Sequence, residues 1–450
     1  MKTTNQAKTL QSKTFARILR NHQGRVLTCT AVLLCGLAAS ISAKAAPTVI
    51  NETPERGFTI PINQQTPVVV KTSPDAECDL SAQGGDESKK LRLYANIDGY
   101  VRFHVKARQE SDEQRLQLDC KAKGLVTRYP IHLLAGSSPT AEMPFPTSEA
   151  PLPKGSTVRL GLSEAEAQLL SDDDLLQRGY PQRPEASDAP ESYAKWLEQM
   201  SRPMAMIPAH SVSRTDISAA PATKKSSNWS GLEAHRTVTH TWDTVQGEWA
   251  IPDLVIGESG TTTYSATWVG LDGDGLKDLV QAGSEQDDTD FIFQITSYTA
   301  WTELLPNQPT EQVAGLSINP GDDFAVYVYI GNSTGKRDIK GGYAWFSLND
   351  YTSGVGTVIS TPLAGTFVNG TEAEWIMERP KVGGSLPDLS EYITLIMTNS
   401  YAHKAGGKLI PCGTAANRDI DMYNGSDLLS AAIWNGTGSN FVTFLWTNFH

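Results

Sequence analysis

The sequence predicts a mainly β protein whose C-terminal half is an antiparallel sandwich or barrel. Three observations favour this fold class. Short runs of alternating apolar and polar residues recur along residues 47–136 and again from Asn228 to the end. Gly, Asn and Asp separate these runs at close intervals, as turn residues do. Helical periodicity is confined to the intervening residues 137–225.

Length and charge narrow the classes of function. The chain has 450 residues, which is enough for two or three structural units. Its 38 Lys and Arg residues against 50 Asp and Glu residues give a net charge of -12. Such a surface repels phosphates, so no nucleic-acid partner is expected.

Residues 1–45 have the pattern of an export signal. Basic residues from Lys2 to Arg25 precede an apolar run from Val26 to Ala39, and Ala43-Lys44-Ala45 is a small-x-small cleavage site. The apolar run is short for a membrane span, which needs about 20 residues. An uncleaved anchor is the alternative. We expect a secreted protein, extracellular or periplasmic, with no membrane attachment after signal removal.

Residues 46–136 are expected to form a small β-domain. Runs such as Leu91 to Ala95 alternate in polarity, and Ile97-Asp98-Gly99 is a turn signal. Because an exported protein permits disulfides, Cys78 and Cys120 are the candidate pair. Cys412 is then expected to be a free, buried thiol.

Residues 137–225 are predicted to form a propeptide-like linker with two short helices. Ser163 and Glu166 make a capping box at the start of one helix. In the other helix, an apolar stripe recurs at helical spacing from Tyr193 to Met200. This second helix either packs on its own domain or covers an active-site cleft as a propeptide. The pair Lys224-Lys225 is a candidate processing site.

Residues 226–450 carry many evenly spaced strand patterns, which predict a sandwich or barrel. The expected strands are Val245–Ile251, Thr262–Leu271, Phe291–Leu304, Phe324–Ile330, Tyr343–Leu348, Ala373–Glu378, Tyr392–Met397 and Phe441–Trp446.

Several common catalytic patterns are absent from the sequence. There is no HExxH and no Asp-Thr-Gly or Asp-Ser-Gly. Asp272 to Asp278 has some likeness to a calcium loop, but the terminal bidentate Glu is missing, so we interpret it as a turn, with a calcium loop as the alternative. We therefore predict no metal and no cofactor.

Six short segments of this half occur in the order and at the spacing of a known family. They are Asn228-Trp229-Ser230-Gly231, Gln246 to Pro252, Trp268 to Asp274, Leu279 to Gly283, Tyr298 to Leu304, and Ala373 to Glu378. Together they resemble the glutamic peptidases, or eqolisins, whose pattern includes NWAG, WVGIDGD, LQTG and AEWIVE. The resemblance covers residues 226–450, about half of the chain.

The resemblance implies a concanavalin-like antiparallel β-sandwich and an endopeptidase with an acid pH optimum. It implies Gln281 and Glu378 as the catalytic pair and polypeptides as substrates, and we expect a monomer. It also implies cleft residues at Trp229, Trp268, Asp272, Trp301 and Glu303. The departures at Ala282, Thr299 and Leu304-Leu305 bear on substrate preference.

This residue pair suits peptide hydrolysis. A carboxylate can take a proton from a water molecule and pass it to the leaving amine, so Glu378 is predicted to act as base and then acid. An amide N–H can bind the developing oxyanion without changing its charge with pH, which is the role predicted for Gln281.

Two other functions are alternatives to peptide hydrolysis. A glycoside hydrolase needs two carboxyl groups roughly 5–9.5 Å apart. Glu374 and Glu378 are about 13 Å apart along an extended strand, although Glu303 or Asp272 could supply the partner. A carbohydrate- or peptide-binding module with aromatic platforms would bind without turnover.

Overall fold

The computed structural model describes residues 48–50, 58–84, 89–136, 152–214, 217–218, 225–255, 261–434 and 436–450. The predicted export signal, residues 1–45, and Lys224 of the predicted processing pair lie outside this set. Within the described ranges, no helix has both the length and the apolar character needed to span a membrane.

The N-terminal strands build a 5-stranded sheet in the order β2-β8-β7-β4-β5. Its strands are β2 (Phe58–Pro61), β8 (Leu125–Gly136), β7 (Glu113–Ala122), β4 (Glu77–Ala82) and β5 (Leu91–Tyr94). A second set of paired strands comprises β1 (Thr48–Ile50), β3 (Thr66–Lys71) and β6 (Tyr100–Lys106). A disulfide joins Cys78 on β4 to Cys120 on β7, directly across the ladder.

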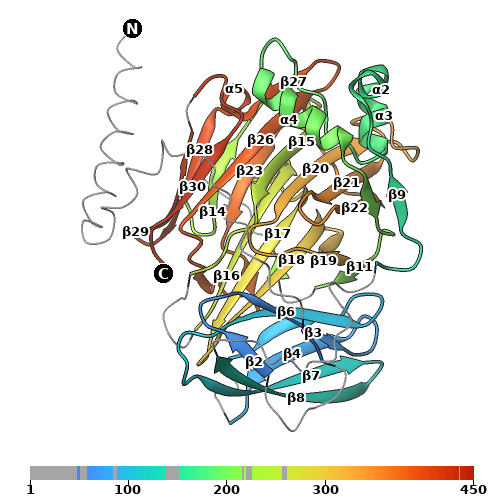
Figure 1. Cartoon of the computed structure of the whole chain (residues 1–450). Coiled ribbons are helices and arrows are strands. Elements are labelled where there is room, and N and C mark those ends of the chain that lie inside the picture. The colour runs from blue at the N-terminus through green and yellow to red at the C-terminus, as the bar shows by residue number, and fades with distance from the viewer. Residues whose placement is uncertain are drawn as a thin grey trace. The chain divides into compact units, whose positions relative to one another are not determined.

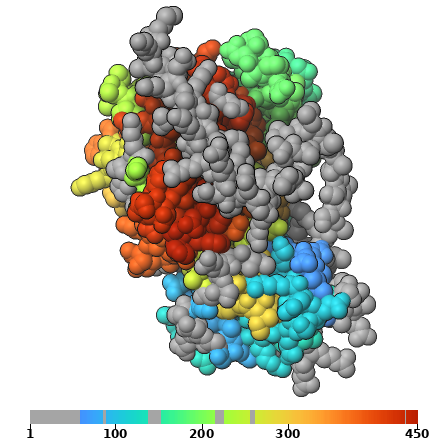
Figure 2. Space-filling model, turned by 90° about the vertical axis from the view of Figure 1, so that its left-hand side faces the viewer, coloured from blue at the N-terminus to red at the C-terminus, as the bar shows by residue number. Residues whose placement is uncertain are grey.

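These N-terminal strands share their core with the C-terminal half. Strand β6 pairs with the start of β18, where Lys106 lies opposite Gln294. Phe293 and Ile295 pack fully buried among the apolar side chains of the N-terminal strands. Figure 2 shows this junction at the surface, with yellow residues of the C-terminal half among the blue and cyan N-terminal strands.

The linker region holds short helices and strands. They are β9 (Thr157–Arg159), α2 (Glu164–Leu169), α3 (Asp172–Gln177), α4 (Pro190–Ser201), β10 (Met204–Met206), β11 (Ser211–Ser213), β12 (Ile217–Ser218) and β13 (Lys225–Ser226). The predicted capping box of Ser163 and Glu166 opens α2. A second capping box, Ser171 with Asp174, opens α3 and was not expected.

The C-terminal half is an antiparallel β-sandwich of two layers (Figure 1). Hydrogen-bonded neighbours in the first layer are β19 (Gln308–Ser317), β18 (Gln294–Leu305), β17 (Leu279–Asp290), β16 (Thr262–Leu271), β23 (Ala373–Glu378), β14 (Trp229–Glu233) and β28 (Arg418–Asn424). Neighbours in the second are β22 (Val355–Pro362), β21 (Tyr343–Asp350), β20 (Asp323–Gly331), β15 (Trp242–Ala250), β26 (Thr394–Lys404), β30 (Val442–Trp446) and β29 (Asp427–Ile433). The remaining elements are β24 (Lys381–Val382), β25 (Asp388–Leu389), β27 (Leu409–Pro411) and α5 (Cys412–Ala415).

Alternation along each strand decides which side chains enter the space between the layers. In the first layer Val269, Ala282 and Trp375 point inward, and Trp249 and Val326 meet them from the second layer. The intervening residues of the first layer, among them Gln281 and Glu378, therefore lie on its outer face.

The predicted fold class is confirmed, because the described chain is mainly β and its C-terminal half is a sandwich. Each of the eight expected strands in that half overlaps an observed strand, and Thr262–Leu271 and Ala373–Glu378 have the predicted bounds. Strand β17 was not expected as a strand. Cys412 is buried and unpaired.

Candidate active site

Strand register places Gln281 and Glu378 on the same face of the first layer. Strand β16 runs between their strands, with Ala266 opposite Glu378 and Gly270 opposite Gln281. Ala266 and Gly270 are four residues apart on one strand, so residues opposite them point to the same side. Trp268 lies between Ala266 and Gly270 on this face of β16, and its ring takes the place beside Gly270 that a side chain there would fill.

Both side chains line one small pocket on this face. Its lining residues are Ala266, Gln281, Glu285, Trp301, Glu303, Thr310, Glu378 and Pro380. The pocket has room for roughly one water molecule. A carboxyl group, an amide and space of this size are the parts that hydrolysis by an activated water requires.

Glu378 is buried, with 2% of its surface exposed, and is held by two hydrogen bonds. The indole N–H of Trp268 donates to its Oε2 at 2.8 Å, and the amide of Asn228 donates to its Oε1 at 3.3 Å. Burial raises the pKa of Glu378 to about 8, and the nearby Glu303 carboxyl adds to the rise. The two hydrogen bonds favour the charged form and so oppose that rise.

Gln281 is fully buried and oriented by Glu303. Its Nε2 donates to Oε2 of Glu303 at 2.5 Å, while Thr310 Oγ1 donates to the other carboxyl oxygen at 2.8 Å. Burial raises the pKa of Glu303 to about 7. The Oε1 atom of Gln281 is buried and accepts no hydrogen bond from the described residues. This oxygen is therefore available to a water molecule in the pocket.

The three predicted tryptophans lie together beside the pair. Trp229, Trp268 and Trp301 form one buried apolar cluster with Ala266 and Ile376, among others. The rings of Trp229 and Trp268 meet edge to face with centroids 4.9 Å apart. This apolar wall limits water access to Glu378 and explains why burial is the largest cause of its raised pKa.

Comparison with known proteins identifies this half of the chain. Residues 227–443 match the profile of the Peptidase A4 family. The C-terminal region is therefore similar to this peptidase family. Aspergillopepsin-2 of Aspergillus niger is 27% identical over 231 residues, which cover 46% of this chain and 74% of that protein. The resemblance to glutamic peptidases that the sequence predicted is confirmed.

Solved structures of glutamic peptidases are similar to about half of the chain. Scytalido-glutamic peptidase with a transition state analog inhibitor is 20% identical with a TM-score of 0.39, covering 49% of this chain and 98% of that one. SCP-B, an eqolisin in complex with the tripeptide Ala-Ile-His, is 19% identical with a TM-score of 0.37 and the same coverage.

Asp272 does not lie with the peptidase pocket, although the resemblance had implied a place in the cleft. Asp272 adopts a φ of 61°. Its carboxylate accepts hydrogen bonds from the backbone N–H groups of residues 369–372 at 2.5 to 3.3 Å. Burial raises its pKa, and these hydrogen bonds oppose that rise. Asp272 thus fixes the loop that leads into β23.

Replacing Asp272 with Ala is expected to destabilise the peptidase. The change leaves several buried backbone N–H groups without an acceptor, and each unpaired group costs roughly 1–3 kcal/mol of stability. Chemical denaturation should show a loss of about 3 kcal/mol or more in the free energy of unfolding. Asp278→Ala is a matched control on the same turn, since its carboxylate accepts one backbone bond, from Phe367. Equal stability of the two variants would contradict this role.

Helix α4 packs away from the pocket, so the interpretation that it covers the cleft is wrong. Lys195 forms an ion pair with Glu248, and Gln199 donates to the same carboxylate at 2.8 Å. Glu248 lies on β15 of the second layer, next to the inward-facing Trp249, so it points to the outer face of that layer. The whole sandwich therefore separates α4 from Gln281 and Glu378.

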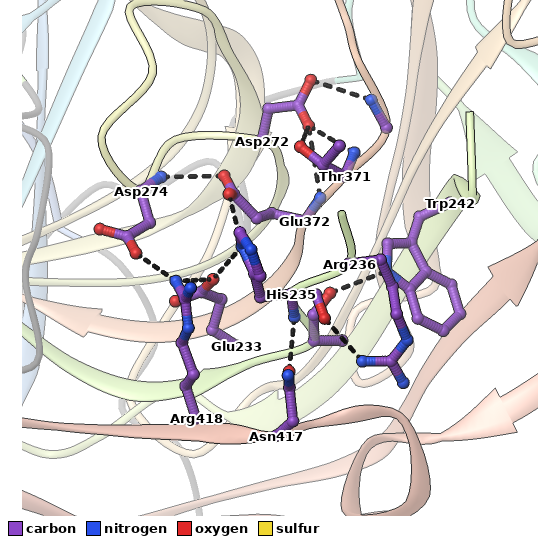
Figure 3. A network of polar contacts seen from close by, with 12 residues as sticks. Glu233, His235, Arg236, Trp242, Asp272, Asp274, Thr371, Glu372, Asn417 and Arg418 are labelled. Carbon is purple, nitrogen blue, oxygen red and sulfur yellow. Dashed lines mark hydrogen bonds and ion pairs between the residues drawn. The ribbon is translucent and has the colours of Figure 1, made fainter. Parts of the chain in front are cut away.

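A second cluster of acids lies at the other end of β23 (Figure 3). His235 Nδ1 contacts Glu372 at 2.9 Å and Glu233 at 3.3 Å, while Arg418 pairs with Glu233 at 2.8 Å and Asp274 at 2.6 Å. The ligand atoms of Glu233, His235 and Glu372 lie within 4.8 Å of one another, close enough to hold an ion. Arg418 already supplies positive charge at this place, so we assign the cluster no metal.

Sequence reasoning assigned no role to three polar residues that contact the pair or line its pocket. Asn228 was part of a quoted motif but received no role, although its amide holds Glu378. Glu285 and Thr310 lie outside every motif and enter the pocket through the register of β17 and β19. The signal for Glu285 was its spacing of four from Gln281 on one strand.

Proposed function

We propose that this chain is an exported endopeptidase that cleaves proteins at acid pH with Glu378 and Gln281 as its catalytic pair. The observation that carries the proposal is the small pocket in which both side chains meet, within a region of the Peptidase A4 family. The relative Aspergillopepsin-2 and the sequence pattern of the first 45 residues support it further. A glycosidase or a binding module receives no support from these comparisons.

The proposed chemistry uses one water molecule and no cofactor. Glu378 takes a proton from the water as its oxygen attacks the scissile carbonyl carbon, and later gives that proton to the leaving amine. One N–H of Gln281 is held by Glu303. The other N–H can donate to the developing oxyanion, and Oε1 can hold the attacking water.

The protonation state of Glu378, on which this chemistry depends, is set by how far water reaches the pocket. A general base must be ionised, and a pKa of about 8 keeps the buried carboxyl protonated at acid pH. Because burial is the largest cause of that shift, opening the pocket to water lowers the pKa toward its ordinary value. The closed form is therefore expected to be latent, and the active form to be more exposed.

The test is a pH-resolved digestion of denatured protein by the purified full chain, with and without pepstatin. Once the pocket has opened, we expect peptide release with an optimum near the ordinary pKa of Glu, about 4.3, where Glu378 is partly ionised, and no inhibition by pepstatin, which targets aspartic peptidases. A β-glucan offered under the same conditions should release no sugar. Inhibition by pepstatin, or sugar release without peptide release, would overturn the proposal.

A further inference from the structure

A segment of the chain itself adds a strand to the edge of the catalytic layer. Strand β11 pairs antiparallel with β19, with Ser211 opposite Val313 and Ser213 opposite Glu311. The backbone N–H of Arg214 continues this ladder by donating to the carbonyl of Thr310 at 2.7 Å. Extended peptides bind sheet edges in this way, with main-chain bonds for affinity and side-chain pockets for specificity.

The side chain of Arg214 enters the site next to the catalytic pair. It is 2% exposed, and its guanidinium forms an ion pair with the carboxylate of Glu285, which is equally buried. Glu285 lies four residues beyond Gln281 on β17, on the same face, and lines the same pocket. The ring of Tyr94 lies 5.4 Å from the guanidinium carbon and completes the enclosure.

The same segment reaches the opposite side of the pocket. Strand β12 pairs with β24, with Ile217 opposite Val382 and Ser218 opposite Lys381. Lys381 directly follows Pro380, which lines the pocket, just as Thr310 lines it on the other side. Residues 211–213 are thus paired with β19 on one side of the pocket, and residues 217–218 are paired with β24 on the other.

We infer that residues 211–214 and 217–218 lie along the substrate cleft and that Glu285 forms a subsite for a basic side chain, filled here by Arg214. This inference rests on the proposed function and adds a substrate class to it. Extended peptides with Arg at the matching position are the preferred substrates, and they compete with the chain's own segment. The planar guanidinium pairs with a carboxylate better than a neutral group of the same shape does.

The test measures binding apart from turnover. A fluorescent peptide with the sequence of residues 211–218 is compared with the same peptide carrying citrulline, a neutral isostere, in place of Arg. The binding proteins are full-length chains that carry Glu378→Gln to prevent cleavage, with and without Arg214→Met. We expect the Arg peptide to bind the Arg214→Met chain about tenfold more tightly than the citrulline peptide. The Arg peptide should bind the chain that keeps Arg214 at least tenfold more weakly than it binds the Arg214→Met chain.

A double change gives the matched control. Arg214→Met with Glu285→Gln removes both charges together, which avoids leaving either buried without its partner. We expect this chain to bind the two peptides equally. Arg202→Ala, which removes an exposed guanidinium paired with Glu198 on the surface, should behave as the parent. Equal affinity for the Arg and citrulline peptides in the Arg214→Met chain would overturn the subsite.

Cleavage by chains that keep Glu378 provides a second readout that needs no change at Arg214. Paired substrates with Arg or citrulline should differ about tenfold in kcat/KM, and Glu285→Gln should abolish the difference. Charge-dependent binding without any cleavage would leave the subsite in place and defeat the peptidase proposal. Cleavage without a preference for Arg would defeat the subsite alone.

Discussion

Glu378→Gln should lower kcat/KM for an unfolded protein at acid pH by about 10³-fold or more, because it removes the proposed proton acceptor. The substitution keeps the shape of the side chain, and its amide oxygen can still accept from Trp268. The fold is therefore expected to survive, as circular dichroism and thermal melting would show. Wild-type activity in purified Glu378→Gln would contradict the assignment.

Glu374→Gln is the matched control for this variant. Glu374 lies on the same strand and the same face, four residues earlier, and is equally buried. Burial, followed by the neighbouring acids, raises its pKa well above the ordinary value, so the residue is already neutral at acid pH. We expect Glu374→Gln to keep activity within a few-fold of the parent, which separates the two glutamates of one motif.

Gln281→Ala tests the other half of the pair. Loss of one preorganised oxyanion donor typically costs about 10²–10³-fold in kcat, and a similar loss is expected here. The change also removes the partner of Glu303, so Glu303→Gln should reduce activity less, by loosening the amide rather than removing it. Activity of Gln281→Ala equal to the parent would contradict the proposed role of the amide.

The second large effect concerns stability, which we expect to fall as the pH rises from 5 to 8. Burial and neighbouring acids raise the pKa of several carboxyl groups above the ordinary 4.5. They are Glu233 and Glu303 at about 7, and Glu372 and Glu378 at about 8. The folded state thus binds protons that the unfolded state releases. Its stabilisation is complete below about pH 4.5 and is lost as pH passes through 7 to 8.

Urea denaturation at intervals of pH measures this effect. The free energy of unfolding should decrease by several kcal/mol between pH 5 and 8, since each unit of pKa shift corresponds to about 1.4 kcal/mol. Glu372→Gln should flatten the profile, because it removes one group whose ionisation the fold opposes. Glu185→Gln, on an exposed side chain, is the control and should leave the profile unchanged. A free energy of unfolding that stays constant over this pH range would contradict the prediction.

Local signals in the sequence predicted much of the architecture and the two central residues. Alternating runs predicted the bounds of β16 and β23, because period-two alternation and flanking turn residues can be recognised from neighbouring positions in the sequence. The ordered segments around Gln281 and Glu378 indicated the family, and the capping box located the start of α2.

Strand β17 is an element that such local signals did not predict. Its second half, Ser284 to Asp290, is rich in acids and amides, which are rare in strands. It is a strand because β18 pairs with it along its whole length and β16 pairs with residues 280–289, and every one of its residues is buried. Only that pairing brings Glu285 into the pocket.

The sequence by itself determined the fold class, the family of the C-terminal half and the identity of the catalytic candidates, because these depend on residues close together in the chain. Tertiary structure alone decided that Asp272 holds a loop, that α4 lies on the opposite face, and that Arg214 meets Glu285. The reason is physical: side chains 71 positions apart become neighbours only when strands pair in a particular register, and local propensity does not encode that register.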